Sequence, residues 1–250
     1  MNEVLVTGNT LPEAYHNALL ALSREGQITP VSDYDTTQKE LSLTMVVKNP
    51  LSEPMISRCF IGGARDLEQY RQEILDGILD FEIENGNWDY TYHSRMAEQF
   101  DFILSELRRN PDSRRAVIDV RDWRTDSIKS NPACLQHIQY LIRDGKLHCK
   151  VLFRSNDAAK ASFMNAFSLI MLQKRFAEEL GAKMGTYTHR ANSYHVYEKD
   201  FPLLEGYVKR ISGGGDITYY YEGDWALQME DAKEEIAQFV RKRKEKIGAG

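Results

Sequence analysis

One segment limits the possible folds of this chain more than any other. From Ala161 to Leu180 the sequence predicts a helix, and Gly181 ends it. The helix is apolar on most of its circumference, which is typical of a helix covered on nearly all sides by the rest of a domain. The other segments must therefore pack around it. With 250 residues, of which 42% are hydrophobic, the chain can bury a core of that size.

Alternating apolar residues predict a sheet beside this helix. The strands expected from period-two alternation run over 40–47, 116–120, 138–142 and 147–153, with shorter strands near Tyr187, at 194–197 and at 217–221. Asp144-Gly145 separates two of these runs and is a strong signal for a tight turn. It predicts an antiparallel hairpin in the middle of the chain.

Helix signals account for most of the remainder. Thr10-Leu11-Pro12-Glu13 has the form of a capping box and predicts a helix that Gly26 ends. Further helices are expected over 67–79, 96–109, 202–210 and 228–246. No repeat, linker or low-complexity block divides the sequence. We therefore expect residues 1–250 to form a single α+β domain with a mixed or antiparallel sheet and a long, central, buried helix.

Composition excludes several classes of protein. No stretch approaches the ~20 apolar residues that cross a bilayer, and Met1-Asn2-Glu3-Val4 does not begin a secretory signal, so we expect a soluble, cytoplasmic protein without a membrane partner. A net charge of −5 argues against general affinity for nucleic acid, and no specific nucleic-acid partner is expected. The three cysteines lack C-x-x-C spacing, so neither a disulfide framework nor a metal site is predicted.

Three arginines could bind an anion. Arg114 and Arg115 stand at the entry to a predicted strand, and Arg154 stands with Ser155 at the exit of another. Guanidinium groups bind phosphate through paired hydrogen bonds, so these residues could hold a phosphomonoester. Arginines at strand ends are also common as solvated surface charge.

The cysteines differ in position. Cys134 lies in Asn131-Pro132-Ala133-Cys134, a loop directly before a strand, whereas Cys149 falls on the inward rhythm of its strand and Cys59 lies in an apolar loop. A thiol at a loop-to-strand junction near arginines can serve as a nucleophile. A free cysteine is also often simply buried.

Three other polar side chains could take part in chemistry. His195 and Tyr197 lie two apart on a predicted strand and so share a face, where they could bind a sugar hydroxyl. Glu73 interrupts an apolar helix face, where burial would raise the pKa of its carboxyl and suit it to proton transfer. The sequence has no G-x-G-x-x-G, G-x-x-x-x-G-K-[ST], H-E-x-x-H or G-x-S-x-G. It therefore gives no support for a nicotinamide-dependent enzyme, a P-loop protein, a zinc protease or a serine hydrolase.

Together these residues resemble thymidylate synthase and its relatives, the pyrimidine-nucleotide hydroxymethylases. The likeness covers about residues 90–200 well. It is carried by Ser113-Arg114-Arg115, the Pro-x-Cys segment ending at Cys134, Gln139, Asp144-Gly145-Lys146-Leu147, Arg154-Ser155-x-Asp157, Asn165 and His195-x-Tyr197.

The resemblance implies a role for each site residue. Cys134 would add to C6 of a pyrimidine ring, and Asn165 would bind the base. Arg154 and Ser155 would hold the 5′-phosphate, together with Arg114 and Arg115 from the second subunit of a homodimer with shared sites. His195 and Tyr197 would bind the sugar 3′-hydroxyl, and Asp157 the pterin of the folate. Glu73 and Tyr92 would be the proton-relaying glutamate and the active-site tyrosine. The one-carbon donor would be 5,10-methylenetetrahydrofolate, with no metal.

The resemblance leaves the product open. Asn165 favours uracil, since an aspartate is typical at this position in deoxycytidylate hydroxymethylases, and this implies conversion of dUMP to dTMP. The alternative is a 5-hydroxymethyl nucleotide made from dUMP, dCMP or CMP. A third possibility is a catalytically silent protein that binds nucleotide or RNA as a regulator. The chain departs from the family at Leu135 and Ser193, where histidine and aspartate are common. Trp88 is also too near Tyr92 in sequence to match the tryptophan of methyl-forming members.

Overall fold

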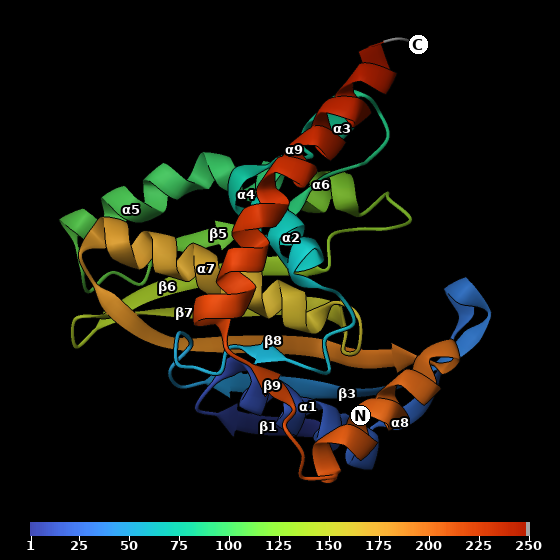
Figure 1. Cartoon of the computed structure of the whole chain (residues 1–250). Helices are drawn as coiled ribbons and strands as arrows, with labels where there is room; N and C mark the ends of the chain where they lie inside the picture. Colours follow the sequence, from blue (N-terminus) through green and yellow to red (C-terminus); the bar gives the residue numbers. More distant parts are fainter. Residues whose placement is uncertain (249–250) are drawn as a thin grey trace.

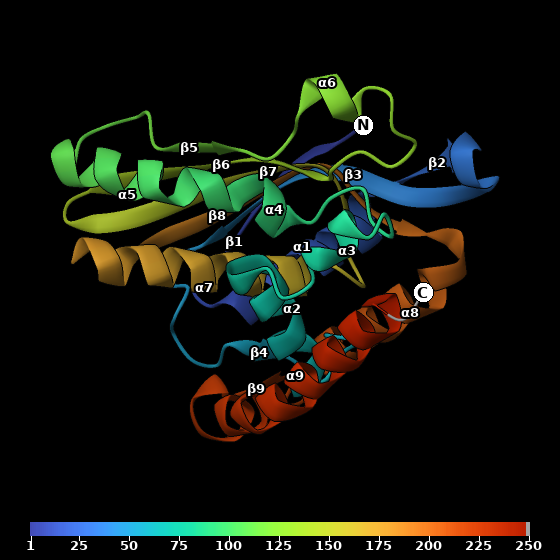
Figure 2. The ribbon, with the colours of Figure 1, turned by 90° about the horizontal axis from the view of Figure 1, so that it is seen from above.

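The computed structural model describes residues 1–248 and contains one large mixed sheet covered by helices. Within these residues, seven strands form the sheet in the order β1-β3-β8-β7-β6-β5, and β2 pairs with β3 beyond that path. Figure 2 shows helices α7, α2 and α9 on one side of this sheet, and α6 on the other. The architecture is the predicted α+β class with a mixed sheet.

The N-terminal part contributes one edge of the sheet. It comprises β1 (Glu3–Gly8), α1 (Leu11–Glu25), β2 (Gln27–Val31) and β3 (Thr36–Val47). The capping prediction for α1 is confirmed, because the Thr10 side chain accepts a hydrogen bond from the Glu13 amide and Gly26 ends the helix. The sequence analysis missed β1 and β2. β1 pairs parallel to β3, a contact between distant segments that local alternation does not report.

The other edge is built on the predicted hairpin. β6 (Leu135–Arg143) and β7 (Lys146–Asp157) are antiparallel, and the turn places Asp144 at φ 52° and Gly145 at φ 69°. Both angles are left-handed, the conformation that an Asp-Gly pair accommodates in a two-residue turn. Beside them, β5 (Val117–Asp119) forms the edge.

β8 (Lys183–Tyr197) is one long strand, where the sequence predicted two short ones. Leu43 pairs with Ala191 and Leu41 with Tyr194, so at this point β8 holds one more residue than β3. This bulge reverses which side chains face the helices. Tyr194 then turns towards α7, where its hydroxyl is 3.0 Å from that of Ser162, and the alternation of apolar residues along β8 is interrupted.

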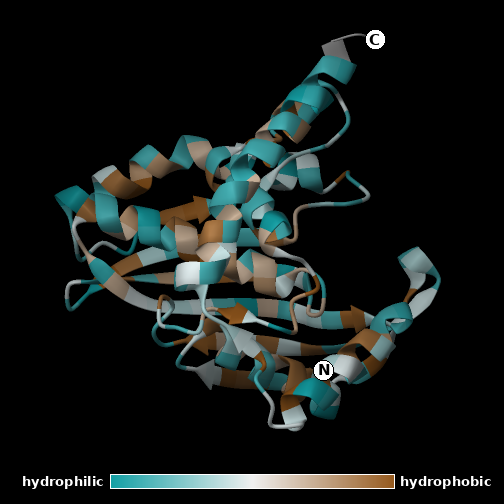
Figure 3. Ribbon diagram, in the orientation of Figure 1, coloured by the Kyte–Doolittle hydropathy of each residue, from teal (hydrophilic) through white to brown (hydrophobic). Residues whose placement is uncertain are grey.

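Helix α7 (Ser162–Leu180) is the central buried helix predicted from the sequence, with thirteen buried residues. Around it lie α2 (Ala64–Asp76), α5 (Phe100–Arg109), α8 (Phe201–Ser212) and α9 (Ala226–Gly248), the last largely hydrophilic in Figure 3. The short elements are η1 (Ser32–Tyr34), β4 (Ile56–Ser57), α3 (Phe81–Glu84), α4 (Tyr92–Met96), η2 (Ala97–Gln99), α6 (Trp123–Asp126), η3 (Glu198–Asp200), β9 (Thr218–Tyr219) and the π-helical turn η4 (Tyr221–Trp225).

One continuous hydrophobic core joins these layers, from Leu11 in α1 to Met229 in α9. That continuity is what a single domain would show, and the extent of that domain over residues 1–250 stays a prediction. No helix among residues 1–248 is both long enough and apolar enough to span a membrane.

Candidate active site

The site residues gather at one end of the sheet, the end where the β8 arrow points in Figure 1. Parallel strands β7 and β8 finish here, with Asp157 paired to His195, and β6 begins here at Leu135. Side chains at the ends of neighbouring strands are brought together by the sheet itself. This explains how residues separated by more than 60 positions come to share one site.

Arg154 holds the loop that carries Cys134. Its backbone amide donates to the Cys134 carbonyl at 2.8 Å, and its guanidinium donates to the carbonyls of Pro132 at 2.7 Å and Ala133 at 3.1 Å. These bonds use two of the five guanidinium N–H groups. The others remain for an anion, so Arg154 can both fix the loop and bind a phosphate.

The Cys134 thiol is partly buried beside this arginine. Burial raises the pKa of the Cys134 thiol above its usual value, and the charge of Arg154 opposes that rise. Cys59 and Cys149, in contrast, are fully buried. Of the three thiols, Cys134 is therefore the one that a ligand can reach.

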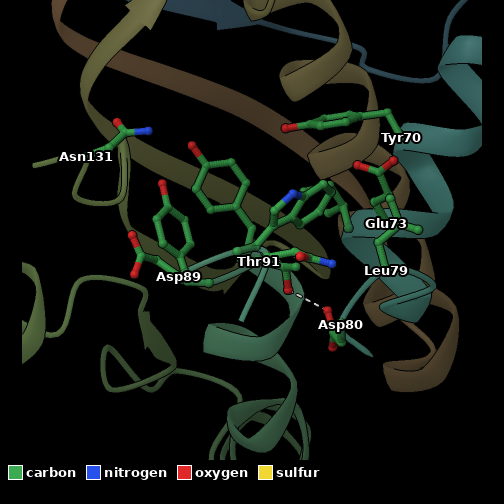
Figure 4. Close-up of a pocket in the computed structure, with 12 residues that line it drawn as sticks. Tyr70, Glu73, Leu79, Asp80, Asp89, Thr91 and Asn131 are labelled. Atoms are coloured by element: carbon green, nitrogen blue, oxygen red, sulfur yellow. Dashed lines mark hydrogen bonds between the residues drawn. The ribbon is translucent and has the colours of Figure 1, made fainter. Parts of the chain in front are cut away.

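A cavity of about 400 Å³ is lined by Tyr90 and Tyr92, two tyrosines whose pKa values are raised by burial and then by the charge of Cys134. Figure 4 shows Tyr70 and Glu73 projecting from α2 on one side of it and Asn131, from the loop before Cys134, on the other. Its remaining lining residues are Ile74, Leu79, Asp80, Asn87, Trp88, Asp89 and Thr91. Half of the lining residues are aromatic or aliphatic and the other half are polar, a combination that suits a flat heterocyclic ligand.

The tyrosines of the wall are protonated donors near Cys134. Burial, and then the negative charge of neighbouring groups that include the Cys134 thiolate, raises the pKa of Tyr90 to about 12 and that of Tyr92 further. The Tyr92 hydroxyl oxygen accepts a hydrogen bond of 3.3 Å from the Leu135 amide. Tyr92 therefore contacts the residue that follows the candidate nucleophile.

Glu73 lies on the same face of α2 as Tyr70. Burial raises the pKa of the Glu73 carboxyl, while a hydrogen bond from Gln69 at 2.8 Å and the charge of Arg243 oppose the rise. A carboxyl with a raised pKa can exchange protons near neutral pH. Tyr70 donates a hydrogen bond to Oδ1 of Asn165, which α7 carries, so α2 and α7 meet at this contact.

His195 and Tyr197 share a face because they lie two positions apart on β8, and the bulge before Tyr194 places that face opposite the one that Tyr194 occupies. Their rings are 4.8 Å apart, and Nδ1 of His195 lies 3.4 Å from the Ser155 hydroxyl. Burial lowers the pKa of His195, opposed by the Ser193 carbonyl and by the charges of Asp157 and Glu40. A neutral imidazole is both donor and acceptor, so this group can bind a hydroxyl.

Asp157 is partly used by the protein. Its Oδ1 accepts the amides of Ala159 at 3.0 Å and Lys160 at 2.9 Å, which shapes the turn before α7. The second carboxylate oxygen, Oδ2, is the one available to a ligand.

Arg114 and Arg115 are not brought to Cys134 within one chain. The Arg114 carbonyl accepts a hydrogen bond from Gln139 and the Ala116 carbonyl accepts one from Tyr140, which places both arginines far along β6. Cys134 precedes Tyr140 by six residues, or about 20 Å of strand. These arginines instead line a separate hollow of about 310 Å³.

Three residues near the site were not predicted. Trp88 lines the cavity despite its short sequence distance from Tyr92. Glu40 accepts a hydrogen bond of 2.6 Å from Ser193, so a carboxylate from β3 stands beside His195. Tyr70 lines the cavity and contacts Asn165, and the sequence analysis gave it no role. All three depend on contacts between distant segments, and nothing in their local sequence signals a role.

Comparisons with known proteins show the family of the chain. The sequence profile described as thymidylate synthase matches residues 66–216, more than half of the chain. A putative thymidylate synthase of Methanocaldococcus jannaschii is 30% identical, in a match covering 79% of this chain and 93% of that protein. One from Methanosarcina barkeri is 27% identical, covering 83% and 96% respectively.

A solved structure shares the fold. The thermostable thymidylate synthase A from Bacillus subtilis superposes with a TM-score of 0.64 over 80% of this chain and 84% of that one, at 19% sequence identity. The matches to these two relatives and to this structure extend over about four fifths of the chain.

Proposed function

Since the chain belongs to the thymidylate synthase family, we propose that it transfers a one-carbon unit from 5,10-methylenetetrahydrofolate to C5 of dUMP and yields dTMP. The family uses that folate as donor, and its members are one-carbon transferases. The observation that carries the proposal is the placement of Cys134. Arg154 fixes its loop, and Tyr92, which contacts the next residue Leu135, lines a cavity that also contains the carboxyl of Glu73.

Cys134 would act by covalent activation. C5 of a pyrimidine is a weak nucleophile, but addition of the Cys134 thiolate at C6 turns C5 into an enolate carbon that attacks the one-carbon unit. Removal of the C5 proton would then expel the folate nitrogen and leave an exocyclic methylene on C5, and the S–C6 bond would break when hydride from the folate reduces that methylene to methyl. The carboxyl of Glu73 and the hydroxyl of Tyr92 are the groups placed to move protons around this ring.

Negative charge develops at O4 of the base during addition. The side-chain amide of Asn165 is the group proposed to bind O4, and a hydrogen-bond donor fixed there stabilises the charge in the transition state. His195 and Tyr197 would hold the 3′-hydroxyl, with Ser155 and Arg154 on the 5′-phosphate. Binding the nucleotide at both ends orients C6 towards the sulfur.

The cavity supports a folate partner for this reaction. Trp88, Tyr90 and Leu79 give it flat apolar walls, and Asp157 offers a carboxylate oxygen to a pterin. The folate would supply the one-carbon unit and the hydride that reduces it.

Hydroxymethylation is the second candidate product. It is favoured by Leu135 in place of the common histidine, and by segments 110–115, 139–144 and 154–157, which read like the bacteriophage hydroxymethylases. A catalytically silent, nucleotide- or RNA-binding regulator is the third. The intact Cys134 and Arg154 pair argues against it. The cytoplasmic location and the homodimer stay predictions from the family.

The product identifies the function. The protein is incubated with dUMP, dCMP or CMP and labelled methylenetetrahydrofolate, and nucleotide and folate products are weighed by mass spectrometry. We expect a methyl gain on dUMP together with dihydrofolate. A hydroxymethyl gain with tetrahydrofolate would assign the second candidate. Cys134→Ser is expected to abolish turnover while retaining nucleotide binding, and substantial remaining turnover would contradict the covalent mechanism.

A further inference from the structure

The hydrogen bond between Tyr70 and Asn165 joins the two helices that face the site. The Tyr70 hydroxyl donates to Oδ1 of Asn165, and the Tyr70 ring lines the cavity next to Glu73. Asn165 is 5% exposed, and its backbone is held in α7 by a hydrogen bond to the Ala161 carbonyl. The amide can therefore turn only about its own side-chain torsion, and Tyr70 contacts the end that would turn.

Tyr70 keeps its proton. Burial, followed by the charges of neighbours that include Tyr92 and Glu73, raises the pKa of Tyr70 well above its usual value. A protonated phenol is a stronger hydrogen-bond donor than acceptor, because its oxygen lone pair is partly delocalised into the ring, so it favours the carbonyl oxygen of an amide over the NH₂ group, as the bond to Oδ1 of Asn165 shows. Tyr70 thus selects one of the two orientations of the Asn165 amide, with Oδ1 towards α2 and Nδ2 free to donate elsewhere.

This orientation matches one base better than the other. Uracil presents an acceptor, O4, and a donor, N3–H, whereas cytosine presents a donor, the N4 amino group, and an acceptor, N3. Nδ2 can donate to O4, and Oδ1 has a second lone pair that can accept N3–H while it accepts Tyr70. Against cytosine the same amide sets a donor opposite a donor, which costs binding free energy.

We propose that Tyr70 is a positioning residue that sets the preference for uracil over cytosine by fixing the orientation of the Asn165 amide. The inference deepens the proposed function and rests on it, since it takes Asn165 as the group that contacts the base. Tyr70 itself need not touch the nucleotide. Its effect reaches the base only through Asn165.

The test is the Tyr70→Phe variant, which removes one oxygen. Dissociation constants for dUMP and dCMP are measured by titration calorimetry on the full chain. Without the Tyr70 donor the amide can turn, and we expect the preference for dUMP over dCMP to fall by about 5- to 100-fold, the range for one matched hydrogen-bond pair. Tyr140→Phe is the matched control. Its hydroxyl is buried and has no partner among residues 1–248, so this variant should keep the wild-type preference.

A second pair of variants separates positioning from general damage. In an Asn165→Ala background, adding Tyr70→Phe should leave the dUMP-to-dCMP ratio unchanged, because no amide remains to be oriented. An unchanged ratio in the single Tyr70→Phe variant, or an equal loss for both nucleotides, overturns the assignment of Tyr70 alone. Failure of the wild-type protein to bind either nucleotide overturns the proposed function as well.

Discussion

At the scale of single residues, the most informative group is the Arg154 guanidinium. It donates hydrogen bonds to the carbonyls of the loop before Cys134. Its positive charge also lowers the pKa of the Cys134 thiol. Burial works in the opposite direction and raises the pKa of Cys134. The reactivity of the thiol is therefore a balance between desolvation and one cation, and that balance can be measured directly.

The raised pKa of Cys134 fixes the sign of a pH dependence. The thiolate fraction is small at neutral pH and grows as the pH rises towards the pKa. Alkylation of Cys134 by iodoacetamide should therefore accelerate with pH. In Arg154→Gln the opposing cation is lost, so the curve should move to higher pH, while Arg154→Lys should move it less. The rates are followed by mass spectrometry of the peptide carrying Cys134, and Cys149, which is fully buried, is the internal control.

Coincident pH curves for the Arg154→Gln variant and the parent would contradict this balance. They would mean that Arg154 has no electrostatic effect on the sulfur, and that its role is confined to holding the loop.

Residue types and their spacing were enough to nominate most of the site. Cys134, Arg154 and His195 each stand at the end of a predicted strand, and the sheet brings such ends together. The bond from Tyr70 to Asn165 could not be read in this way, because it depends on how α2 lies against α7. Glu40 was missed for the same reason, since its neighbour Ser193 is over 150 positions away in the chain.

At the scale of elements, the bulge in β8 accounts for both an error and a success. Before the bulge the buried side chains are at odd-numbered positions such as Tyr187 and Ala191, and after it they include Tyr194 at an even-numbered position. The apolar alternation is therefore interrupted, and in the sequence one strand looks like two. The same extra residue moves His195 and Tyr197, which share a face through strand alternation, to the face opposite Tyr194. The hairpin and α7 were predicted correctly, because an Asp-Gly turn and an apolar helix are local signals, whereas the parallel pairing of β1 is not local.

The loop after α3 depends on a contact from the far end of the chain. The Glu82 carbonyl accepts the amides of Asn87 at 2.9 Å and Trp88 at 3.2 Å, and its carboxylate accepts hydrogen bonds from the Asn87 side chain and from Arg243 of α9. The Glu82 side chain is fully buried, and the Arg243 guanidinium lies 5.7 Å from the centre of the Trp88 ring. α9 thereby supports the cavity wall that contains Trp88.

Removal of Arg243 should loosen this wall. In Arg243→Ala the buried Glu82 carboxylate loses its cation, and an unpaired buried charge is unfavourable. We expect faster amide hydrogen exchange over residues 82–88, with little change in the β6–β7 hairpin. Arg241→Ala is the matched control, since Arg241 contacts Glu234 of its own helix at 2.9 Å. Equal exchange in both variants would show that α9 does not order the loop.

At the scale of the whole molecule, the position of Arg114 and Arg115 bears on assembly. Both lie along β6 at about 20 Å from Cys134, too far to bind the same phosphate as Arg154 within one chain. A second copy of the chain could supply them, as the family resemblance implies. A site that combines these arginines with Cys134 therefore requires a second copy of the chain.

Mixed variants test this sharing. Arg115→Ala and Cys134→Ser should each inactivate a homodimer, one through the phosphate site and the other through the nucleophile. If sites are shared, a refolded equimolar mixture contains heterodimers with one site free of both substitutions, and activity should return to about a quarter of the wild-type value. Turnover of dUMP measures it. A mixture as inactive as its components would argue that each chain completes its own site.

The position of α9 has a practical consequence for protein design. The family profile ends at residue 216 and α9 begins at Ala226, so an engineer guided by the profile alone would discard this helix. Without α9, the side of α2 that packs against it would be exposed to solvent, and α2 is the helix that carries Tyr70 and Glu73. The Glu82 carboxylate would also lose the Arg243 guanidinium as its counterion. Trimming at the end of the profile would thus disturb the helix from which Tyr70 and Glu73 project.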